Sequence, residues 1–323
     1  MPKTFLNNKR REGRYRDSSK TTVIVSLWFL ILTSHVYNVH KADQIIMRLR
    51  DVVNVPSELR NLVPNSFDII GSREGAVAII EIPPELEAYK HEIATALIKL
   101  NKNLRAVIRR SGARQGTFRL YETEVLVPGP TEVIHKELGY RLLIDPTKVF
   151  FSPRDQSDRL ELSLLVKPGE SIAYLFAGAG PYAFAILKMQ PNIFSIHAVE
   201  LNPVAVQYLE KNVILNKARG RVIPVEDDAR HFCEAVGKGF NRVIMTLPLG
   251  AAQYFKYALS CVVNGGIIHF YHTGSEEEPW REAESIVSSN CIEAGINCNI
   301  VSRKIVREYA PYVYKIRMDI RLS

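Results

Sequence analysis

The run S-I-A-Y-L-F-A-G-A-G-P-Y-A-F-A-I-L-K-M-Q-P-N-I-F-S-I-H-A-V-E-L-N-P occupies residues 171–203. Its apolar start, 172–176, predicts a buried strand that breaks into a glycine turn, and Pro181 suits the first position of a helix. A second short strand, 193–199, ends on Glu200. In such a βαβ unit the glycines bring backbone N–H groups close to a ligand, while the acid accepts hydrogen bonds from ribose hydroxyls. The run therefore predicts a pocket for an adenosine-containing ligand.

Segments with strand and helix patterns alternate on both sides of this run. The order predicts a doubly wound parallel sheet, a Rossmann-like α/β domain over residues 149–323, with its ligand site at the carboxyl ends of the strands. The further predicted helices are 155–166, 204–216, 229–236 and 251–263, and the further predicted strands are 221–225, 242–247 and 267–271.

The glycine pattern alone does not identify the ligand. Gly178, Gly180 and Glu200 fit a dinucleotide-binding fingerprint as well as they fit S-adenosylmethionine binding. Two later strand ends favour S-adenosylmethionine. An acid in residues 226–230, E-D-D-A-R, can accept a hydrogen bond from the amino group of an adenine. Residues 245–248, M-T-L-P, resemble the turn that S-adenosylmethionine-dependent enzymes methylating a planar nitrogen have at this strand end. S-adenosylmethionine is therefore the predicted cofactor, and an NAD-dependent oxidoreductase is the open alternative.

Upstream of this domain the sequence predicts a small α+β domain over residues 56–148. Residues 66–82 are typical of a two-stranded hairpin, and Pro83-Pro84 open a helix with one apolar face. Further strands are predicted at 104–108, 118–127 and 140–144. Appended to an adenosine-binding unit, such a domain is suited to contact a large substrate.

Within this small domain, residues 99–121 hold seven Lys and Arg and no acid. Unopposed cations are suited to phosphate contacts, each of which adds salt-dependent affinity by counterion release. The alternative is an ordinary solvated face. Because the cluster precedes an adenosine-binding unit, we expect it to contact RNA. The predicted RNA-binding residues are Lys99, Lys102, Arg105, Arg109, Arg110, Arg114 and Arg154.

Residues 1–55 are predicted to form an N-terminal extension. Its first 20 residues are basic and polar, and Val23 to Leu32 is an apolar run broken only by Ser26, about half of the roughly 20 residues that span a bilayer. Three interpretations stay open: an extension outside the fold with Met47 as an alternative start, a membrane anchor, and a helical arm packed on the protein. The rest of the chain predicts a cytoplasmic protein.

The composition is that of a globular protein with room for two domains: 323 residues, 46% hydrophobic and 24% charged. The net charge of +8 is weak evidence for nucleic-acid binding, because residues 1–46 contain eight Lys and Arg against three acids. The four cysteines show no zinc-binding spacing, so no metal is expected. A Cys291–Cys298 disulfide is possible, but buried thiols are preferred.

Seven motifs, taken together, resemble the archaeal and eukaryotic tRNA (guanine-37-N1)-methyltransferases and their wyosine-pathway relatives. The resemblance covers most of residues 60–323. It implies a Rossmann-like class I S-adenosylmethionine-dependent methyltransferase domain preceded by a small RNA-contacting domain. It also implies methyl transfer to N1 of the guanine 3′ of the anticodon in tRNA, or of a wyosine-type derivative. The motifs are F-D-I-I-G (67–71), I-H-K-E-x-G (134–139), F-S-P-R (151–154), F-A-G-A-G-P-Y (176–182), E-x-N-P (200–203), V-I-M-x-L-P (243–248) and Y-A-P-x-x-Y (309–314).

The resemblance also implies roles for individual residues. Asp158, in the Asp158-Arg159 pair, matches the base that removes the N1 proton, and Arg119 matches the donor to guanine O6. Thr246 is the third predicted catalytic residue. The alternative for Asp158 and Arg159 is an ordinary charged pair on a helix surface. The alternative for Arg119 is one more arginine that binds phosphate. The predicted cofactor-binding residues are Phe176, Gly178, Gly180, Glu200, Asp228, Ala229, Leu247 and Pro248.

Two positions depart from the family pattern. Family members usually carry Asn where this chain has Thr246, and Asp where it has Tyr174. The Thr246 hydroxyl cannot donate and accept hydrogen bonds at the same time in the planar arrangement that an amide offers. Tyr174 replaces an acid that would lie near the methionine end of the cofactor. A catalytically impaired tRNA-binding relative is therefore an alternative to the enzyme. We expect a monomer without an obligate protein partner.

Overall fold

The computed structural model describes residues 48–115 and 120–323. Most of the predicted extension, including its apolar run, therefore lies outside the described residues, and so does Arg119. Within the described ranges, no helix combines the length and the apolar character needed to cross a membrane.

A small sheet is built from β1 (Asp68–Ser72), β2 (Gly75–Ile80), β3 (Leu104–Gln115) and β4 (Leu120–Val127), in that order. The first two strands form the predicted antiparallel hairpin. The 3-10 helix η2 (Pro84–Tyr89) and α3 (Lys90–Leu100) then cross over, so β3 runs parallel to β2, and β4 returns antiparallel beside β3.

The helix α3 packs its apolar face on this sheet, with Ile93 and Leu97 fully buried. Leu49, at the start of α2 (Leu49–Val52), is buried in the same core together with Val53 and Val55. The predicted boundary at residue 55 is therefore wrong for residues 48–55, because their apolar side chains complete the core of the small sheet.

A two-stranded hairpin connects the small sheet to the rest of the chain. It consists of β5 (Val133–Glu137), which the sequence did not predict, and β6 (Tyr140–Ile144), which it did. The His135 ring accepts a hydrogen bond from the backbone N of Gly71 at 3.2 Å. On the other side, the backbone N of Leu143 donates to Asn212 Oδ1 at 2.6 Å. The hairpin thus has hydrogen bonds to both neighbours.

A seven-stranded sheet forms the centre of the second part, in the order β12-β13-β11-β10-β7-β8-β9. The last strand in sequence, β13, lies between β11 and β12 and is antiparallel to both. The prediction of an all-parallel sheet is therefore wrong at β13, whereas the predicted doubly wound class holds. The strands are β7 (Ser171–Leu175), β8 (Ser195–Glu200), β9 (Val222–Glu226), β10 (Phe240–Met245), β11 (Val262–Ser275), β12 (Cys298–Ala310) and β13 (Val313–Leu322).

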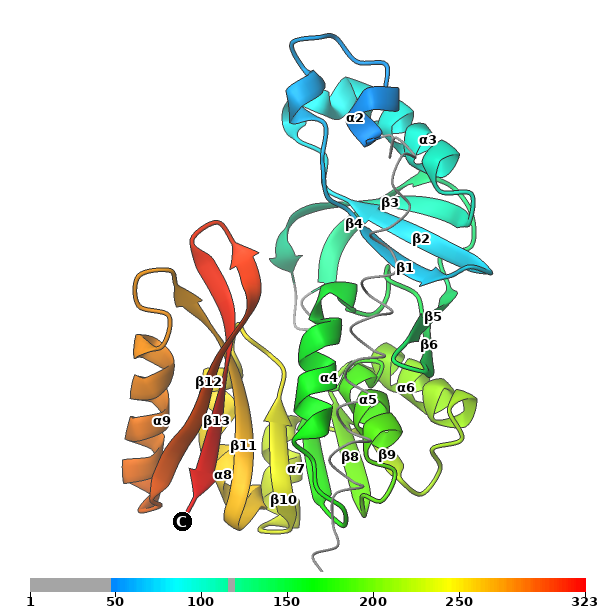
Figure 1. Ribbon diagram of the computed structural model, residues 1–323. Coiled ribbons are helices and arrows are strands. Elements are labelled where there is room, and N and C mark those ends of the chain that lie inside the picture. The colour runs from blue at the N-terminus through cyan, green and yellow to red at the C-terminus, as the bar shows by residue number, and fades with distance from the viewer. Residues whose placement is uncertain (1–47, 116–119) are drawn as a thin grey trace, which may run out of the picture. The chain divides into compact units, whose positions relative to one another are not determined.

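Helices cover both faces of this sheet (Figure 1). Side chains alternate along β7, so Ile172 packs in one core and Leu175 in the other. The first core includes Leu162 of α4, and the second includes Phe255 of α8. Because both faces of β7 pack against apolar side chains, its sequence is a continuous hydrophobic run. The helices are α4 (Gln156–Leu164), α5 (Pro181–Met189), α6 (Pro203–Leu215), α7 (Ala229–Val236), α8 (Phe255–Cys261) and α9 (Arg281–Ala294).

Cys291 and Cys298 form a disulfide, contrary to the preference for buried thiols at this pair. Gly295 ends α9 with a positive φ of 64° and turns the chain toward β12, which brings the two Cα atoms to 6.2 Å, a distance that a disulfide can bridge. The other two cysteines, Cys233 and Cys261, are buried thiols as predicted, with their Sγ atoms 2.9 Å apart.

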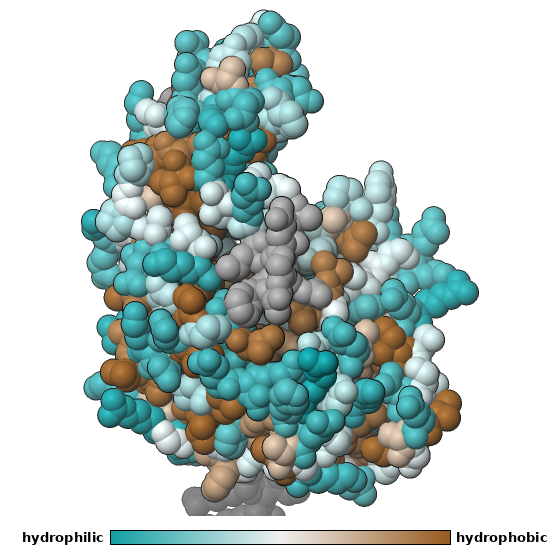
Figure 2. Space-filling model, turned by 180° about the vertical axis from the view of Figure 1, so that it is seen from behind, coloured by the Kyte–Doolittle hydropathy of each residue, from teal (hydrophilic) through white to brown (hydrophobic). Residues whose placement is uncertain are grey.

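On the face shown in Figure 2, polar side chains cover most of the surface and apolar side chains lie in patches between them. Some of the exposed apolar residues, such as Phe194 in the loop before β8 and Ile292 on α9, are far apart in sequence. Apolar exposure of this kind is ordinary on protein surfaces and identifies no interface by itself.

Candidate active site

A cavity of about 380 Å³ lies at the carboxyl ends of β7, β8, β9 and β10. This is the edge at which doubly wound sheets hold their ligands, as the sequence predicted. Seven of the eight predicted cofactor-binding residues line the cavity, and so does Thr246. The seven are Phe176, Gly178, Glu200, Asp228, Ala229, Leu247 and Pro248.

Glu200, at the end of β8, is fixed by two backbone groups. Its Oε2 accepts from the backbone N of Gly178 and its Oε1 accepts from that of Asn202, both at 2.8 Å. Burial raises the pKa of Glu200, and these two hydrogen bonds act against that shift. The remaining lone pairs of the two oxygens can accept ribose hydroxyls. Gly178, which has a positive φ of 55°, leaves the cavity wall free of a side chain beside this acid.

Gly180 is not among the residues that line the cavity, and its predicted contact with the cofactor stays a prediction. It precedes α5 with a positive φ of 88°, and a Cβ there would lie 2.5 Å from Leu209 Cδ1 and 2.9 Å from the Phe184 ring. The glycine is needed for close packing of the turn against α6. Its role is to shape the loop that carries Gly178.

Asp228 lies at the end of β9 and caps α7, accepting from the backbone N of Arg230 at 2.8 Å. Its carboxylate also pairs with the Arg230 guanidinium at 2.8 Å, and this partner lowers the pKa of Asp228. The acid therefore stays ionised beside the cavity. An ionised acid at this strand end can accept a hydrogen bond from the amino group of an adenine.

The two residues that depart from the family pattern, Tyr174 and Thr246, contact each other. Both line the cavity, and the Thr246 hydroxyl lies close enough to Tyr174 to act against the rise in its pKa. Thr246 Oγ1 also lies 3.3 Å from the carbonyl O of Phe176, to which it can donate. Burial raises the pKa of Tyr174, so its phenol stays protonated. Together they form a neutral hydroxyl pair at the ends of β7 and β10.

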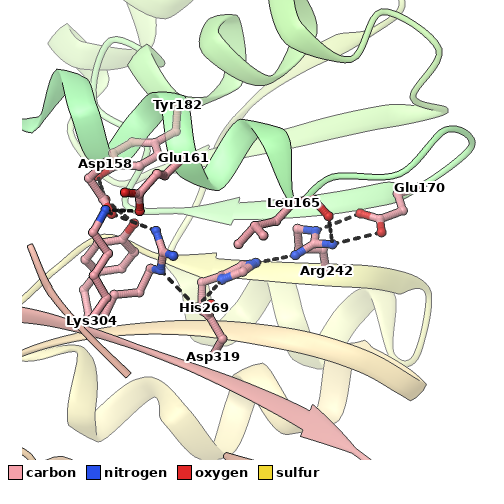
Figure 3. Close-up of polar contacts among 11 residues, drawn as sticks. Asp158, Glu161, Leu165, Glu170, Tyr182, Arg242, His269, Lys304 and Asp319 are labelled. Atoms are coloured by element: carbon pink, nitrogen blue, oxygen red, sulfur yellow. Dashed lines mark hydrogen bonds and ion pairs between the residues drawn. The ribbon is translucent and has the colours of Figure 1, made fainter. Parts of the chain in front are cut away.

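Asp158, the predicted base, is fully buried in α4 and does not line the cavity. Its Oδ2 accepts from the hydroxyls of Tyr182 and Tyr271 at 2.7 and 2.5 Å, and its Oδ1 accepts from Arg317 Nη1 at 2.7 Å. Lys304 Nζ lies 3.5 Å from the same Oδ1 (Figure 3). Because these groups surround the carboxylate, direct contact between Asp158 and a base in the cavity is blocked. Its catalytic role stays a prediction, and it requires an intermediary.

Tyr182 can be that intermediary. It belongs to α5 and lines the cavity, while its hydroxyl donates to Asp158. Burial raises the pKa of Tyr182 well above its usual value, and the negative charge of Asp158 raises it further. The phenol is therefore protonated and lies between the cavity and the buried carboxylate.

A row of buried charges continues from Asp158 away from the cavity (Figure 3). Beyond Arg317, Asp319 Oδ1 accepts from the His269 ring at 2.6 Å, and His269 in turn contacts Arg242. Arg242 ends the row with two hydrogen bonds to Glu170, at 2.7 and 2.9 Å. Breaking one pair in such a row leaves an uncompensated buried charge, which is strongly destabilising. The row therefore holds α4 against β10, β11 and β13.

Arg159 does not form a surface pair with Asp158, so that alternative is wrong. Its guanidinium is buried and makes two hydrogen bonds to Glu137, at 2.6 and 2.5 Å. It also donates to the carbonyl O of Ser152 at 3.1 Å and lines the cavity. Arg159 thus fixes the F-S-P-R turn to the β5–β6 hairpin.

Three charged residues that the sequence analysis missed line the far end of the cavity. Asp155, at the start of α4, is 5% exposed, and it accepts from Arg307 Nε at 2.7 Å and from Lys315 Nζ at 2.8 Å. Burial alone would raise the pKa of Asp155, but the two cations lower it to about 2. Asp155 directly follows the F-S-P-R motif, and this position is the feature of the sequence from which it could have been predicted. Its cationic partners, on β12 and β13, gave no signal because they are about 150 residues away in the chain.

The predicted RNA-binding cluster is only partly unopposed. Lys99, Lys102 and Arg105 are exposed. By contrast, Arg109 pairs with Glu87 at 2.6 Å, and Arg110 pairs with Glu81 at 2.5 Å. The prediction of seven unopposed cations is therefore wrong at these two positions, because acids from η2 and from the loop after β2 lie beside them.

Of the remaining predicted cations, the structure describes the side chain of Arg154 but not those of Arg114 and Arg119. Arg154 donates to Asp68 at 2.6 Å, and it borders a groove next to the cavity together with Arg307 and Tyr309. The side chain of Arg114 lies outside the described residues, as does all of Arg119. Their predicted roles stay predictions.

Comparison with known proteins places this site in a family. The model of the TRM5/TYW2 methyltransferase domain matches residues 133–295, and that of the TYW2 N-terminal domain matches residues 49–131. The chain belongs to the TRM5/TYW2 methyltransferase family. Membership confirms the predicted family, the Rossmann-like class I fold and the S-adenosylmethionine cofactor. It also sets aside the NAD-dependent oxidoreductase. The division into domains at residue 148 stays a prediction.

Three relatives illustrate the range of this TRM5/TYW2 family. The tRNA (guanine(37)-N(1))-methyltransferase Trm5b of Pyrococcus abyssi is 37% identical over 85% of this chain and 80% of its own, and its crystal structure gives a TM-score of 0.76. A complex of aTrm5 with tRNALeu is 32% identical, covers 86% of this chain and 79% of that chain, and gives 0.74. The tRNA(Phe) (4-demethylwyosine(37)-C(7)) aminocarboxypropyltransferase of Pyrococcus horikoshii is 28% identical over 85% of this chain and 96% of its own.

Proposed function

We propose that this chain transfers a methyl group from S-adenosylmethionine to N1 of guanine 37, the base 3′ of the anticodon in tRNA. The observation that carries the proposal is a cavity with two chemically different ends. Glu200 and Asp228 line one end with acids suited to an adenosine, and Asp155, Lys315 and Tyr309 line the other with charges and an aromatic ring. The second end is suited to a planar base that carries hydrogen-bonding groups.

The strand order supports this division of the cavity. Glu200 and Asp228 follow β8 and β9, on one side of the central strand β7, whereas Lys315 and Tyr309 belong to β13 and β12, on its other side. The turn at 246–248 follows β10 and lies between the two groups. A reacting methyl group near this turn would face the adenosine site on one side and the target base on the other.

S-adenosylmethionine, when bound, supplies a methyl group on a positively charged sulfur and is converted to S-adenosylhomocysteine. Guanine N1 must lose its proton before it can attack, and negative charge then moves onto O6. We propose that Tyr182 takes the N1 proton as it passes its own phenolic proton to Asp158. The N1–H bond would break, the N1–C bond would form as the methyl group leaves sulfur, and the proton would remain on Asp158 until it returns through Tyr182 to solvent in the cavity. Arg119 stays the predicted donor to O6.

Contact with tRNA would involve the exposed cations of the small sheet, Lys99, Lys102 and Arg105, and Arg154 at the groove beside the cavity. Among the relatives, aTrm5 has been solved with tRNALeu. We propose a tRNA partner in the cytoplasm on this basis. The expected monomer and the expected lack of a metal stay predictions.

A wyosine-pathway reaction is the second candidate. It is favoured by the match of residues 49–131 to the TYW2 N-terminal domain and by the similarity to the P. horikoshii aminocarboxypropyltransferase. An aminocarboxypropyl transfer would use the same cofactor and would break a different carbon–sulfur bond of its sulfonium. A catalytically impaired tRNA-binding relative is the third candidate, motivated by the Tyr174–Thr246 hydroxyl pair.

One experiment separates these candidates. The purified chain is incubated with S-adenosylmethionine and with three tRNAs that differ at position 37: guanosine, adenosine and 4-demethylwyosine. Nucleosides are then analysed by mass spectrometry. We expect 1-methylguanosine from the first tRNA and no product from the second. A product on 4-demethylwyosine without 1-methylguanosine would establish the wyosine reaction instead. tRNA binding with no product in any sample would identify the impaired relative.

A further inference from the structure

The charged side chains of the cavity are segregated by sign. Among the described lining residues, three acids follow β8 and β9, whereas three cations and one acid belong to α4, to the turn before it and to β12 and β13. This fourth acid, Asp155, is held by two of the cations, Arg307 and Lys315, at 2.7 and 2.8 Å. The side away from the adenosine site therefore carries more cations than acids. The three acids are Glu200, Asp227 and Asp228, and the three cations are Arg159, Arg307 and Lys315.

A neutral wall lies between these two sides. It is formed by Tyr174 at the end of β7 and by Thr246 directly after β10, and both residues line the cavity. Tyr174 is 2% exposed, and burial raises its pKa, so the phenol carries no charge. Its ring packs edge-on against the ring of Tyr182 at a centroid distance of 5.7 Å, and the Arg159 guanidinium lies 5.9 Å from the Tyr182 ring. The charged group beside this aromatic wall is thus a cation.

We propose that the pocket holds the amino-acid end of S-adenosylmethionine by its carboxylate, makes no ionic contact with its ammonium group, and owes this selectivity to Tyr174. With the adenosine at the ends of β8 and β9, the amino-acid end would extend toward β7 and β10, the next two strands of the sheet. There it would meet Tyr174 and Thr246. The inference concerns cofactor binding, so it holds or fails independently of which base receives the methyl group.

Arg159 is suited to hold a carboxylate. It is 1% exposed and lines the cavity, and three of its N–H groups donate to Glu137 and to the carbonyl O of Ser152. A guanidinium has five such donors, so two are not committed to these partners. Hydrogen bonds from a cation to a carboxylate are about twice as strong as those between neutral groups. An ammonium in the same place would be repelled by the guanidinium.

Asp155 is a poor partner for the ammonium, although it is an acid and lines the same side of the cavity. Arg307 Nε donates to one of its oxygens and Lys315 Nζ to the other. A third positive charge would have to enter beside these two cations, and each of them would repel it. The amino-acid end of the cofactor therefore meets a neutral wall and cations, which match its carboxylate and not its ammonium.

Isothermal titration calorimetry with three nucleosides tests the inference. S-adenosylhomocysteine carries both charged groups of the amino-acid end. 5′-S-(3-carboxypropyl)-5′-thioadenosine lacks only the ammonium, and 5′-S-(3-aminopropyl)-5′-thioadenosine lacks only the carboxylate. For the unaltered chain we expect the Kd values of the first two to agree within about threefold. The third should bind about tenfold to hundredfold more weakly, the factor for hydrogen bonds to a charged group.

Three variants test the part played by Tyr174. Tyr174→Asp returns an acid to the wall, so S-adenosylhomocysteine should then bind about tenfold more tightly than the carboxypropyl nucleoside. Tyr174→Phe keeps the wall neutral and should leave the ratio of the two Kd values unchanged. Leu249→Asp is the matched control, because Leu249 is 43% exposed just beyond the turn at 246–248 and is not among the lining residues. It should also leave the ratio unchanged.

Two results would overturn the inference, whatever nucleoside the chain produces on tRNA. The first is an unaltered chain that binds S-adenosylhomocysteine more than about threefold more tightly than the carboxypropyl nucleoside, since the ammonium would then be recognised. The second is an aminopropyl nucleoside bound as tightly as S-adenosylhomocysteine. An unchanged ratio in a folded Tyr174→Asp chain would remove Tyr174 as its determinant. If that variant does not fold, the three titrations of the unaltered chain still decide. The proposed function is judged separately, by the nucleosides formed on tRNA.

Discussion

Tyr182 and Tyr271 donate hydrogen bonds to the same oxygen of Asp158, and of these two only Tyr182 lines the cavity. The two phenols come from opposite elements, α5 and β11, and both are fully protonated because burial raises their pKa values well above the usual range. Their shared acceptor makes them a matched pair for testing how a buried carboxylate could act on a substrate that it does not touch.

Removing the Tyr182 hydroxyl should stop the proposed proton transfer. We expect Tyr182→Phe to lower single-turnover methyl transfer about a hundredfold, the usual contribution of a positioned acid–base group. Tyr271→Phe removes a hydrogen bond to the same oxygen and should change the rate less than about threefold. Asp158→Asn should resemble Tyr182→Phe. Equal losses in the two tyrosine variants, with unchanged affinity for S-adenosylhomocysteine, would reduce Asp158 to a structural role.

Glu200 should control cofactor affinity. We expect Glu200→Gln to weaken S-adenosylmethionine binding about tenfold to hundredfold, because charge-assisted hydrogen bonds to the ribose are replaced by neutral ones. Glu226→Gln provides the control, since Glu226 is opposite Glu200 in the β8–β9 register but does not line the cavity. Isothermal titration calorimetry measures both variants. Similar affinities for the two would show that the cofactor does not use Glu200.

Acid should destabilise the fold through two buried carboxylates. Burial tends to raise their pKa values, but Lys315 and Arg307 bring Asp155 to about 2, and His135 and Arg159 bring Glu137 to about 2. Folding lowers both pKa values, so the two ionised carboxylates stabilise the fold fully when the pH is above their pKa values in the unfolded chain. This stabilisation is lost as the pH falls from about 4.5 to 2. Each acid contributes on the order of 2 to 3 kcal/mol over that window.

Thermal unfolding between pH 5 and pH 2 measures this effect. The melting temperature should fall steeply in that range, and Asp155→Asn should lower it at pH 5 while making the fall shallower. An Asp155→Asn chain with the same slope as the unaltered chain would show that the Asp155 pairs contribute little to stability.

The sequence predicted the parts of the fold that local signals mark. The helix 229–236 agrees with α7 at both ends, because Asp228 caps it and Gly237 stops it. By contrast, β11 begins five residues before the predicted strand at 267 and continues to Ser275, since Gly265 and Gly266 lie within the strand and not before it. Residues 298–322 received no strand prediction. The strands β12 and β13 form a local hairpin, but the pairing of β13 with β11 is long-range, and local patterns do not encode it.

The same distinction applies to the site. Seven of the predicted cofactor-binding residues lie at strand ends or in the glycine turn, so their positions on the cavity wall could be predicted. Asp155 was missed because its partners, Arg307 and Lys315, become neighbours only through the pairing of β12 with β13. Arg109 appeared unopposed because Glu124 comes to lie opposite it only in the β3–β4 register. Charge runs in a sequence show which cations are present, but not which acids fold against them.

The insertion of β13 between β11 and β12 bears on how the protein is made. During synthesis β11 leaves the ribosome before β13, so the edge of β11 that pairs with β13 stays unpaired until residues 313–322 have emerged as well. Until then the nascent protein exposes a template for unwanted pairing, and Lys315 cannot reach Asp155. The site should therefore be completed only after β13 has emerged from the ribosome and has paired with β11.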